Sequence, residues 1–289
     1  MKSVLVTGAN KGIGLAVVEA ILREQPQYSV ILGSRDHHRG ETALNALLAD
    51  NDAWSGRVET LELDVGSDQS VANAHALLAQ RSSGNSPPLH GLVNNAGMGT
   101  GGIAEVMNVN VHGIQRTSEA FAPLLIPGGR IVNVTSAAGP NFVAKCDSQR
   151  QDFFRVSDTN WDQLEQFMQR CQELAPEGFA SLGMNSESIY GLSKACANSY
   201  TLCLARRYPE LLINACTPGF IETDLGKEFL GSRTPSEAGM KSPAEGARVI
   251  VSLLFATPRG SGHYYGSDGL RSPVDRYRAP GMPEYSGSE

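Results

Sequence analysis

The sequence lacks the features that mark several classes of protein. Its formal net charge of −6 and its pI near 5.6 leave no excess of basic residues, so no nucleic-acid partner is expected. Its longest apolar run, residues 249–256, is far shorter than the roughly 20 residues that cross a bilayer, and this predicts no membrane span. The opening stretch MKSVLVTG has no apolar core of about 7–15 residues, as a secretory signal would. We therefore expect a cytoplasmic protein.

Cysteine is scarce and shows no C-x-x-C spacing. The five cysteines are Cys146, Cys171, Cys196, Cys203 and Cys216. An odd number of cysteines in a chain without a secretory signal predicts reduced thiols in a cytosolic setting. We expect them to be small packed side chains, and we predict no metal site.

Internal repeats and long low-complexity blocks are also missing. Only the last stretch, residues 272–289, has the Pro, Gly and Ser composition of a loop. We expect residues 272–289 to form a loop-like tail.

Short apolar runs alternate with helical patterns along the rest of the chain. Strands are expected at 3–8, 29–35, 58–65, 89–97, 129–136 and 211–219, and helices at 15–23, 40–49, 68–81, 106–125 and 188–207. The strand runs are almost continuously apolar, which is typical of parallel strands that are covered on both faces. A length of 289 residues with 41% hydrophobic residues suits one large core. The sequence therefore predicts an α/β fold, a doubly wound parallel sheet of the Rossmann type with right-handed crossovers, in one domain over 1–289.

One segment, residues 137–187, breaks the alternation. It separates Ser136 from Tyr190 by 54 positions, where a short loop would be enough. Helical spacing within it is shown by Leu164, Phe167, Met168, Cys171 and Leu174. Thr159 and Asp162 have the spacing of a capping box at the start of that helix. We predict a helical insertion whose apolar stripe packs against the body of the protein rather than contacting a ligand.

A glycine-rich turn, TGANKGIG at residues 7–14, follows the first strand. Gly8, Gly12 and Gly14 lie between a predicted strand and a predicted helix, the context in which a helix N-terminus holds a pyrophosphate. The spacing is G-x-x-x-G-x-G rather than G-x-G-x-x-G, and glycine also serves tight turns that bind nothing. The turn alone leaves both interpretations open.

Two cations suggest which cofactor the turn would bind. The second strand ends in LGSRD, and Arg35 stands where an NAD site usually has an acidic residue. Lys11 and Arg35 could converge on the 2′-phosphate of NADP with charge-assisted hydrogen bonds. Asp36 could instead meet a 2′-hydroxyl, and both cations could be solvated surface residues. The pattern favours NADPH/NADP as the cofactor.

A set of acid–base residues is predicted at the carboxyl ends of the strands. Tyr190 and Lys194 lie four residues apart and share a helix face, a spacing that also occurs by chance. Ser136 ends a predicted strand, and Asn110 lies on a helix. Reduction of a carbonyl by hydride needs a proton donor and groups that stabilise the oxygen's charge. We therefore assign Tyr190 as general acid, Ser136 as the donor to the carbonyl oxygen, and Lys194 as the cation that lowers the tyrosine pKa and orients ribose hydroxyls.

Taken together, TGANKGIG, NNAG at 94–97, Ser136 and YGLSK resemble the short-chain dehydrogenase/reductase family over nearly the whole chain. The resemblance implies that Asn110 is a fourth catalytic position, where an asparagine helps to hold a water near the lysine. The cofactor contacts that it implies are Gly8, Asn10, Lys11, Gly12, Ile13, Gly14, Arg35, Asp64, Val65, Asn94, Ala96, Gly97, Tyr190, Lys194, Pro218, Gly219, Ile221 and Thr223. Of these, Asp64 and Val65 would contact adenine, and the last four would lie at the nicotinamide end.

Within the family, the chain is most similar to the NADPH-dependent carbonyl reductases that act as monomers. The lysine in the glycine turn, SRD after the second strand and the long helical insertion carry this likeness. In tetrameric relatives the helix that bears the tyrosine packs against another subunit, and the insertion of the monomeric group covers that surface. The likeness therefore implies a monomer.

Two segments limit what the likeness implies about the substrate. Residues 98–107 are shorter and richer in glycine than in animal carbonyl reductases, so a preference for aromatic ketones and quinones does not carry over. Residues 225–241 form the expected lid. Its side chains Phe229, Leu230 and Met240 are explained equally well by substrate contact and by packing.

These observations predict an NADPH-dependent oxidoreductase that reduces a ketone, aldehyde or quinone to an alcohol. The alternative is a regulatory protein that binds NADP(H) without turnover, which would not need the proton donor. A pure interaction module would leave the glycine turn and the acid–base residues unexplained.

Overall fold

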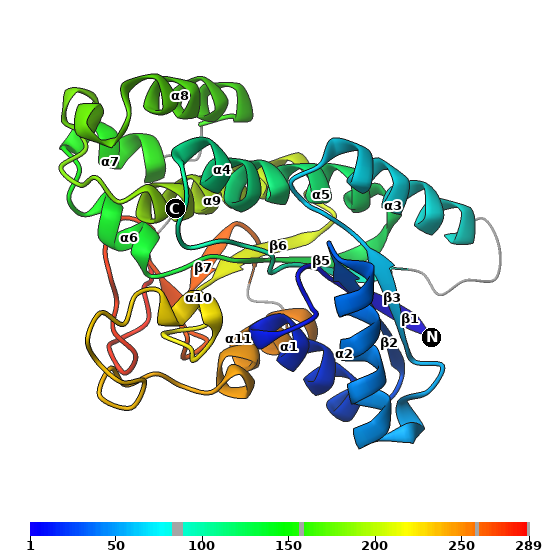
Figure 1. Cartoon of the computed structure of the whole chain (residues 1–289). Helices are drawn as coiled ribbons and strands as arrows, with labels where there is room; N and C mark the ends of the chain where they lie inside the picture. The colour runs from blue at the N-terminus through cyan, green and yellow to red at the C-terminus, as the bar shows by residue number, and fades with distance from the viewer. Residues whose placement is uncertain (83–88, 156–158, 258–259, 288–289) are drawn as a thin grey trace.

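The computed structural model describes residues 1–82, 89–155, 159–257 and 260–287. Within these residues, eight strands form one sheet in the order β3-β2-β1-β4-β5-β6-β7-β8 (Figure 1). The strands are β1 (Lys2–Val6), β2 (Tyr28–Ser34), β3 (Val58–Glu62), β4 (Leu89–Asn94), β5 (Leu125–Val134), β6 (Leu212–Cys216), β7 (His263–Tyr265) and β8 (Arg271–Ser272). All neighbouring pairs are parallel except β7 and β8, which are antiparallel.

The sheet confirms the predicted α/β, doubly wound, Rossmann-type fold. The strand order reverses between β1 and β4, and ligands of such sheets bind outside the carboxyl ends of the strands at this switch point. All six predicted strands are present. The sequence patterns missed β7 and β8, because runs of three and two residues are too short to show a period.

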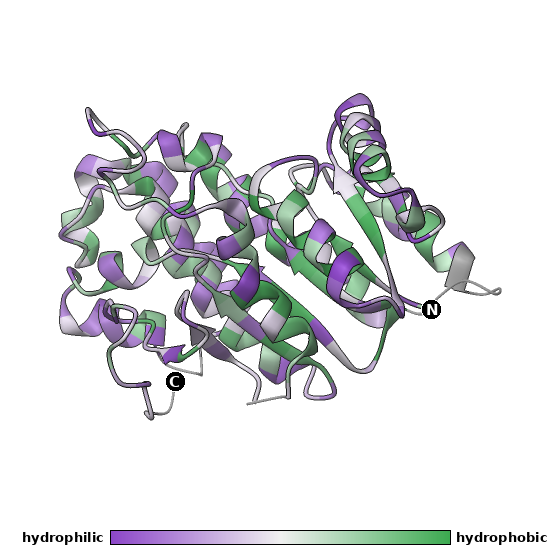
Figure 2. Cartoon of the chain, turned by 90° about the horizontal axis from the view of Figure 1, so that it is seen from below, coloured by the Kyte–Doolittle hydropathy of each residue, from purple (hydrophilic) through white to green (hydrophobic). Residues whose placement is uncertain are grey.

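Helices cover both faces of the sheet (Figure 1). One face carries α1 (Gly12–Glu24), α2 (His37–Asp50) and α11 (Pro243–Phe255), and the other carries α3 (Asp68–Ser82), α4 (Ile103–Met107), α5 (Gly113–Phe121) and α9 (Ile189–Arg207). Val4 and Val6 of β1 pack into the core on the first side, and Leu5 packs into the core on the other. This alternation is why the strands read as continuous apolar runs, and Figure 2 shows them as the most hydrophobic part of the molecule.

The predicted helix over 106–125 is interrupted. A π-helical turn, η2 (Asn108–His112), joins α4 to α5, and a 3-10 turn, η3 (Ala122–Leu124), follows α5. π-helical turns within helices are often found at functional sites. Another 3-10 turn, η1 (Asp52–Trp54), leads into β3.

The insertion between β5 and α9 is helical. It holds α6 (Ala138–Val143), α7 (Ser148–Arg155), α8 (Trp161–Leu174) and the 3-10 helix η4 (Pro176–Leu182), while its positions 156–158 lie outside the described residues. Four members of the predicted apolar stripe are buried, and Leu174, at the end of α8, is exposed.

The predicted capping box of α8 is wrong by one residue. Asn160 is the N-cap: it accepts from the Gln163 amide, and the Gln163 side chain accepts from the Asn160 amide in return. The Thr159 hydroxyl donates instead to the Phe153 carbonyl at 2.8 Å. Asn and Gln side chains can form the same reciprocal pair of hydrogen bonds as Thr and Asp. The sequence pattern alone therefore did not show at which residue the helix begins.

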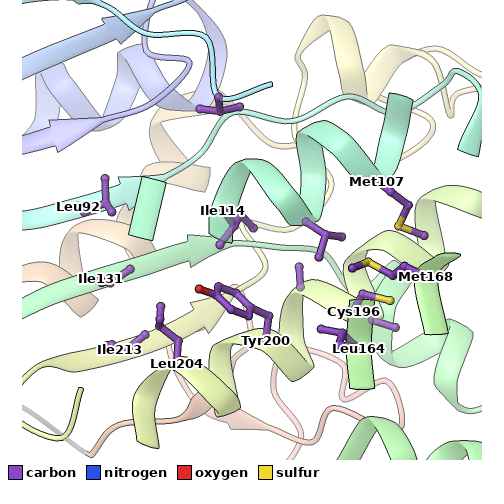
Figure 3. Close-up of a cluster of buried hydrophobic side chains, with 14 of the residues drawn as sticks. Leu92, Met107, Ile114, Ile131, Leu164, Met168, Cys196, Tyr200, Leu204 and Ile213 are labelled. Carbon is purple, nitrogen blue, oxygen red and sulfur yellow. The ribbon is translucent and has the colours of Figure 1, made fainter. Parts of the chain in front are cut away.

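The insertion helices surround α9, which is buried along most of its length. Figure 3 shows Leu164 and Met168 of α8 in one cluster with Cys196 and Tyr200 of α9. Since sheet and insertion enclose α9 from opposite sides, its side chains are held firmly in place.

The chain beyond β8 is anchored by Arg278. The Arg278 side chain is 5% exposed and pairs with Asp268, and it also donates to the Ser272 hydroxyl (2.9 Å) and the Met282 carbonyl (2.7 Å). No helix or strand follows β8 as far as Gly287, and residues 288–289 lie outside the described part.

The five cysteines are free thiols, and four of them are buried. Among the described residues, no group of three or more His, Cys, Asp or Glu side chains could hold a metal ion. No helix in the described part of the chain has the length and apolar character to cross a membrane.

Candidate active site

A cavity of about 680 Å³ opens at the carboxyl ends of the central strands. Most of the predicted site residues line it: Gly8, Asn10, Lys11, Ile13, Arg35, Asp64, Val65, Ala96, Gly97, Ser136, Tyr190, Lys194, Pro218, Gly219, Ile221 and Thr223. The other predicted residues, Gly12, Gly14, Asn94 and Asn110, are not part of its lining.

Glycine is required in the turn because other backbone comes very close. Gly8 has a φ of +61°, and a Cβ there would lie 2.9 Å from the Ala96 Cα. At Gly14 a Cβ would lie 2.5 Å from the Asn95 side-chain nitrogen and 2.6 Å from the Gly8 carbonyl oxygen. The turn therefore packs directly on the segment after β4 and leaves its outer backbone facing the cavity.

Asn94 does not line the cavity, contrary to the prediction. It is buried in a polar network, in which its amide donates to Asn133 (2.8 Å) and Ser118 (3.0 Å) and its oxygen accepts from Thr117 (2.7 Å). The next residue, Asn95, lines the cavity and donates to the carbonyls of Thr7 and Gly8. Successive residues at a strand end point in opposite directions, so NNAG alone did not tell which asparagine faces the cavity.

Asn110 lies in the π-helical turn η2 and is completely buried. Its side-chain oxygen accepts from the Met98 amide, and its nitrogen donates to the Met98 carbonyl and the Ser193 hydroxyl, at 2.9 to 3.0 Å. A Cβ at Gly97 would lie 3.3 Å from the Asn110 oxygen and 3.6 Å from the Lys194 Nζ. Asn110 thus fixes the segment after β4 against α9, close to Lys194.

Ser136, Tyr190 and Lys194 come together despite their separation in the sequence. Ser136 follows β5, and its hydroxyl hydrogen-bonds the Tyr190 hydroxyl at the start of α9. The Lys194 Nζ lies 5.6 Å from the centre of the Tyr190 ring and donates to the Val134 carbonyl at 3.2 Å. The parallel sheet brings the end of β5 beside the first turn of α9.

Burial sets the protonation of this pair. Burial raises the pKa of Tyr190 to about 12; the Ser136 hydrogen bond lowers that pKa and the nearby Glu228 carboxylate raises it. Burial lowers the pKa of Lys194 to about 8. The predicted lowering of the tyrosine pKa by Lys194 is therefore not seen in this structure, where the loss of hydration is the largest effect on the Tyr190 pKa. The phenol keeps its proton at neutral pH, as a proton donor must.

The lid closes over the tyrosine. It begins with the short helix α10 (Asp224–Lys227), and the Phe229 ring lies 5.0 Å from the Tyr190 ring, centre to centre. Phe229 therefore lines the cavity, whereas Leu230 and Met240 are not among its lining residues. A Cβ at Gly226 would lie 2.7 Å from the Met240 methyl group, so Met240 packs against α10.

The far end of the cavity is lined by Arg35, Asp36 and Arg39. The Asp36 carboxylate caps α2 by accepting from the Arg39 amide at 2.9 Å, and this hydrogen bond lowers the pKa of Asp36. It is therefore already engaged within the protein. The prediction missed Arg39, although its position one helical turn after Arg35 was a usable signal.

Lys11 does not converge with Arg35 in this structure. The Lys11 Nζ lies 2.5 Å from the Asp224 carboxylate, at the start of the lid helix. No local pattern in the sequence indicates this pair, which joins positions 11 and 224. Both side chains are exposed, so the Lys11 ammonium is linked to the lid by a solvated contact.

A second cavity of about 290 Å³ adjoins the first, and the two share Ser136, Gly219 and Phe220. The tail contributes Tyr277, Arg278 and Pro280 to its wall. The composition of the tail predicts only a loop, and no pattern in the sequence places the tail beside Ser136.

Comparisons with known proteins agree with this geometry. Residues 2–148 match the model of the short chain dehydrogenase family. The chain is 32% identical to carbonyl reductase (NADPH) 1 of Rattus norvegicus over 273 residues. This match covers 89% of this chain and 92% of the relative. The chain belongs to the short-chain dehydrogenase family. The predicted family is thereby confirmed.

Solved structures similar to this short-chain dehydrogenase include two plant reductases. Salutaridine reductase from Papaver somniferum is 22% identical with a TM-score of 0.76, over 92% of this chain and 99% of the other. Menthone neomenthol reductase from Mentha piperita is 25% identical with a TM-score of 0.73, over 92% of this chain and 98% of the other. Both similarities agree with the doubly wound fold.

Proposed function

We propose that this short-chain dehydrogenase reduces the carbonyl group of a small molecule, a ketone, aldehyde or quinone, to an alcohol with NADPH as cofactor. The observation that carries this proposal is the Tyr190 hydroxyl. It is protonated, hydrogen-bonded to Ser136 and close to Lys194, in the same cavity as the glycine turn. The name of the rat relative, an NADPH-dependent carbonyl reductase, supports the same activity.

The residues of the cavity fit NADPH. The glycine turn presents backbone at the N-terminus of α1, where a pyrophosphate is favoured. Arg35 and Arg39 supply the positive charge that a 2′-phosphate needs. Asp36, the competing group for a 2′-hydroxyl, is engaged as the cap of α2.

The roles of the catalytic side chains follow from their positions. When bound, NADPH supplies the hydride that forms the new C–H bond. Ser136 donates a hydrogen bond to the carbonyl oxygen, and Tyr190 transfers its proton to that oxygen as the C=O double bond becomes single. The Lys194 ammonium, close to the ring, stabilises the phenolate that remains. The products are the alcohol and NADP⁺, and a proton from solvent restores Tyr190.

Tyr190→Phe tests this assignment. We expect kcat to fall about 10²- to 10⁴-fold, the usual contribution of a general acid, while the Kd for NADPH changes less than about twofold. The measurement follows NADPH oxidation with a panel of ketones, aldehydes and quinones, and NADPH binding by fluorescence. Tyr200→Phe is the matched control, because Tyr200 lies on the same helix and its hydroxyl bonds to Glu119 instead. Tight NADPH binding without consumption by the unmodified protein would favour the regulatory alternative.

We further propose that the protein is a monomer. The insertion helices α6, α7 and α8 pack around α9, the helix through which tetrameric relatives would associate. Sedimentation velocity at micromolar concentration should show one species near 30.8 kDa. A species of two or four times that mass would contradict the proposal.

A further inference from the structure

We propose that Glu228 selects carbonyl substrates that carry a protonated amine. This inference rests on the proposed carbonyl reduction and adds a substrate class to it. Glu228 precedes Phe229 on the lid, and both side chains line the cavity beside Tyr190.

Glu228 and Phe229 pack against the glycine-rich segment 98–102. A Cβ at Gly99 would be 2.5 Å from a Glu228 carboxylate oxygen and 2.9 Å from the Phe229 ring. Glycine at this position therefore lets the lid approach the segment after β4. The exposed Glu228 carboxylate therefore lies beside this segment, in the wall of the cavity that Tyr190 also lines.

The other acidic side chains of the cavity wall are already engaged. Asp36 caps α2, and Asp64 accepts from the Gly66 amide at 2.9 Å. Glu228 has no hydrogen bond or ion pair with any residue in the described part of the chain.

The neighbouring lysines do not neutralise Glu228 either. Lys227 pairs with Glu222 at 3.2 Å, and Lys11 pairs with Asp224. The Lys194 ammonium donates to the Val134 carbonyl. The Glu228 carboxylate is nevertheless close enough to interact with the Tyr190 hydroxyl, because its charge contributes to raising the pKa of Tyr190.

An alkylammonium group suits these surroundings. The free carboxylate can form a charge-assisted hydrogen bond with it, and the exposed ring of Phe229 offers a face that attracts cations. A substrate with its own carboxylate would be repelled. The amine takes no part in the redox step, so the hydride and proton transfers are those described above.

Three ketones of similar shape test the inference: 4-(dimethylamino)cyclohexanone, its neutral isostere 4-isopropylcyclohexanone, and 4-oxocyclohexanecarboxylate. We expect kcat/KM at pH 7 to be highest for the amine and lowest for the carboxylate. Glu228→Gln should lower the amine-to-isopropyl ratio about fivefold, as removal of a partly exposed ion pair would. The matched control is Glu237→Gln, which removes a carboxylate of the lid that accepts from Thr234 and does not line the cavity, and it should leave the ratio unchanged.

A binding measurement separates this inference from the proposed activity. Calorimetry should show that 4-(dimethylamino)cyclohexanol binds the unmodified protein about fivefold more tightly than it binds Glu228→Gln, and less tightly at high salt. Equal ratios and equal Kd values in the two proteins would overturn the inference and leave carbonyl reduction intact. If no ketone or other carbonyl compound causes NADPH oxidation, the proposed function fails, and the calorimetry still decides whether Glu228 recognises amines.

Discussion

At the scale of single residues, Lys194 shows that the site is built at a cost in stability. Its ammonium is buried between α9 and the end of β5, with the Val134 carbonyl as its hydrogen-bond acceptor. Burial lowers the pKa of Lys194 from 10.5 to about 8. Below pH 8 the Lys194 ammonium is charged and buried in the folded protein, whereas it is charged and hydrated in the unfolded chain.

Lys194→Met should therefore make the protein more stable at pH 7 and inactive. The lowered pKa corresponds to a penalty of about 3 kcal/mol, and loss of one hydrogen bond offsets about 1 kcal/mol, so the expected gain is about 2 kcal/mol. Because the folded state loses its proton first, the stability of the unmodified protein rises with pH between about 8 and 10.5. Urea unfolding at pH 7 and pH 10, without cofactor, should show the advantage of the variant shrinking as the pH rises. A variant less stable at pH 7 would contradict this account.

At the scale of elements, the start of α2 gives an acidic side chain a structural role and places two basic side chains in the cavity wall. Asp36 caps the helix with its carboxylate, while Arg35 and Arg39 line the cavity on either side of it in the sequence. The helix start therefore engages the acid as a cap, and the exposed Arg39 side chain also pairs with Asp36 at 3.7 Å, a solvated contact that a phosphate can replace.

Arg39→Ala should weaken NADPH binding more than NADH binding. A guanidinium on a phosphate forms a charge-assisted hydrogen bond of about 1.5–3 kcal/mol, so we expect the Kd for NADPH to rise about 10- to 100-fold. The Kd for NADH should change less than about twofold. Arg23→Ala, which removes a cation that pairs with Glu19 on α1 instead, is the control. Equal losses for both cofactors would show that Arg39 does not contact the 2′-phosphate.

At the scale of the whole molecule, the tail (residues 272–289) connects the last strands of the sheet with the active-site region. Arg278 is nearly buried, joins Asp268 before β8 to the backbone of the tail, and lines the second cavity, which shares Ser136 with the first. Burial works against ionisation of Asp268, but hydrogen bonds from Arg278 and backbone amides hold the pKa of Asp268 below its usual value.

Arg278→Met should cost about 1–3 kcal/mol of stability at pH 7, because it leaves the partly buried Asp268 carboxylate without its partner. The pKa of Asp268 is lowered in the folded state, so the stabilisation is present above about pH 4 and is lost as the pH falls through the folded value. Urea unfolding should show a large difference between the two proteins at pH 7 and a smaller one at pH 3. Arg23→Met is the control, since Arg23 and its partner Glu19 are both exposed on α1, away from the tail. Equal losses at both pH values would mean that the effect is packing alone.

The order of the amino acids was enough to predict the sheet, the family and the residues that meet at the carboxyl edge of the sheet. Apolar periodicity and glycine spacing are local, so they are visible in the order of the residues, and parallel topology then brings the strand ends together. Ser136 and Tyr190 were therefore predictable partners across 54 positions.

The protonation and the contacts of these residues could not be predicted before the chain was folded. The direction of the Tyr190 pKa, the choice of Asn95 over Asn94, the pairing of Lys11 with Asp224, and the contact of Glu228 with Gly99 depend on burial and on segments far apart in the chain. Loss of hydration and close packing arise only when those segments meet, so no local pattern records them.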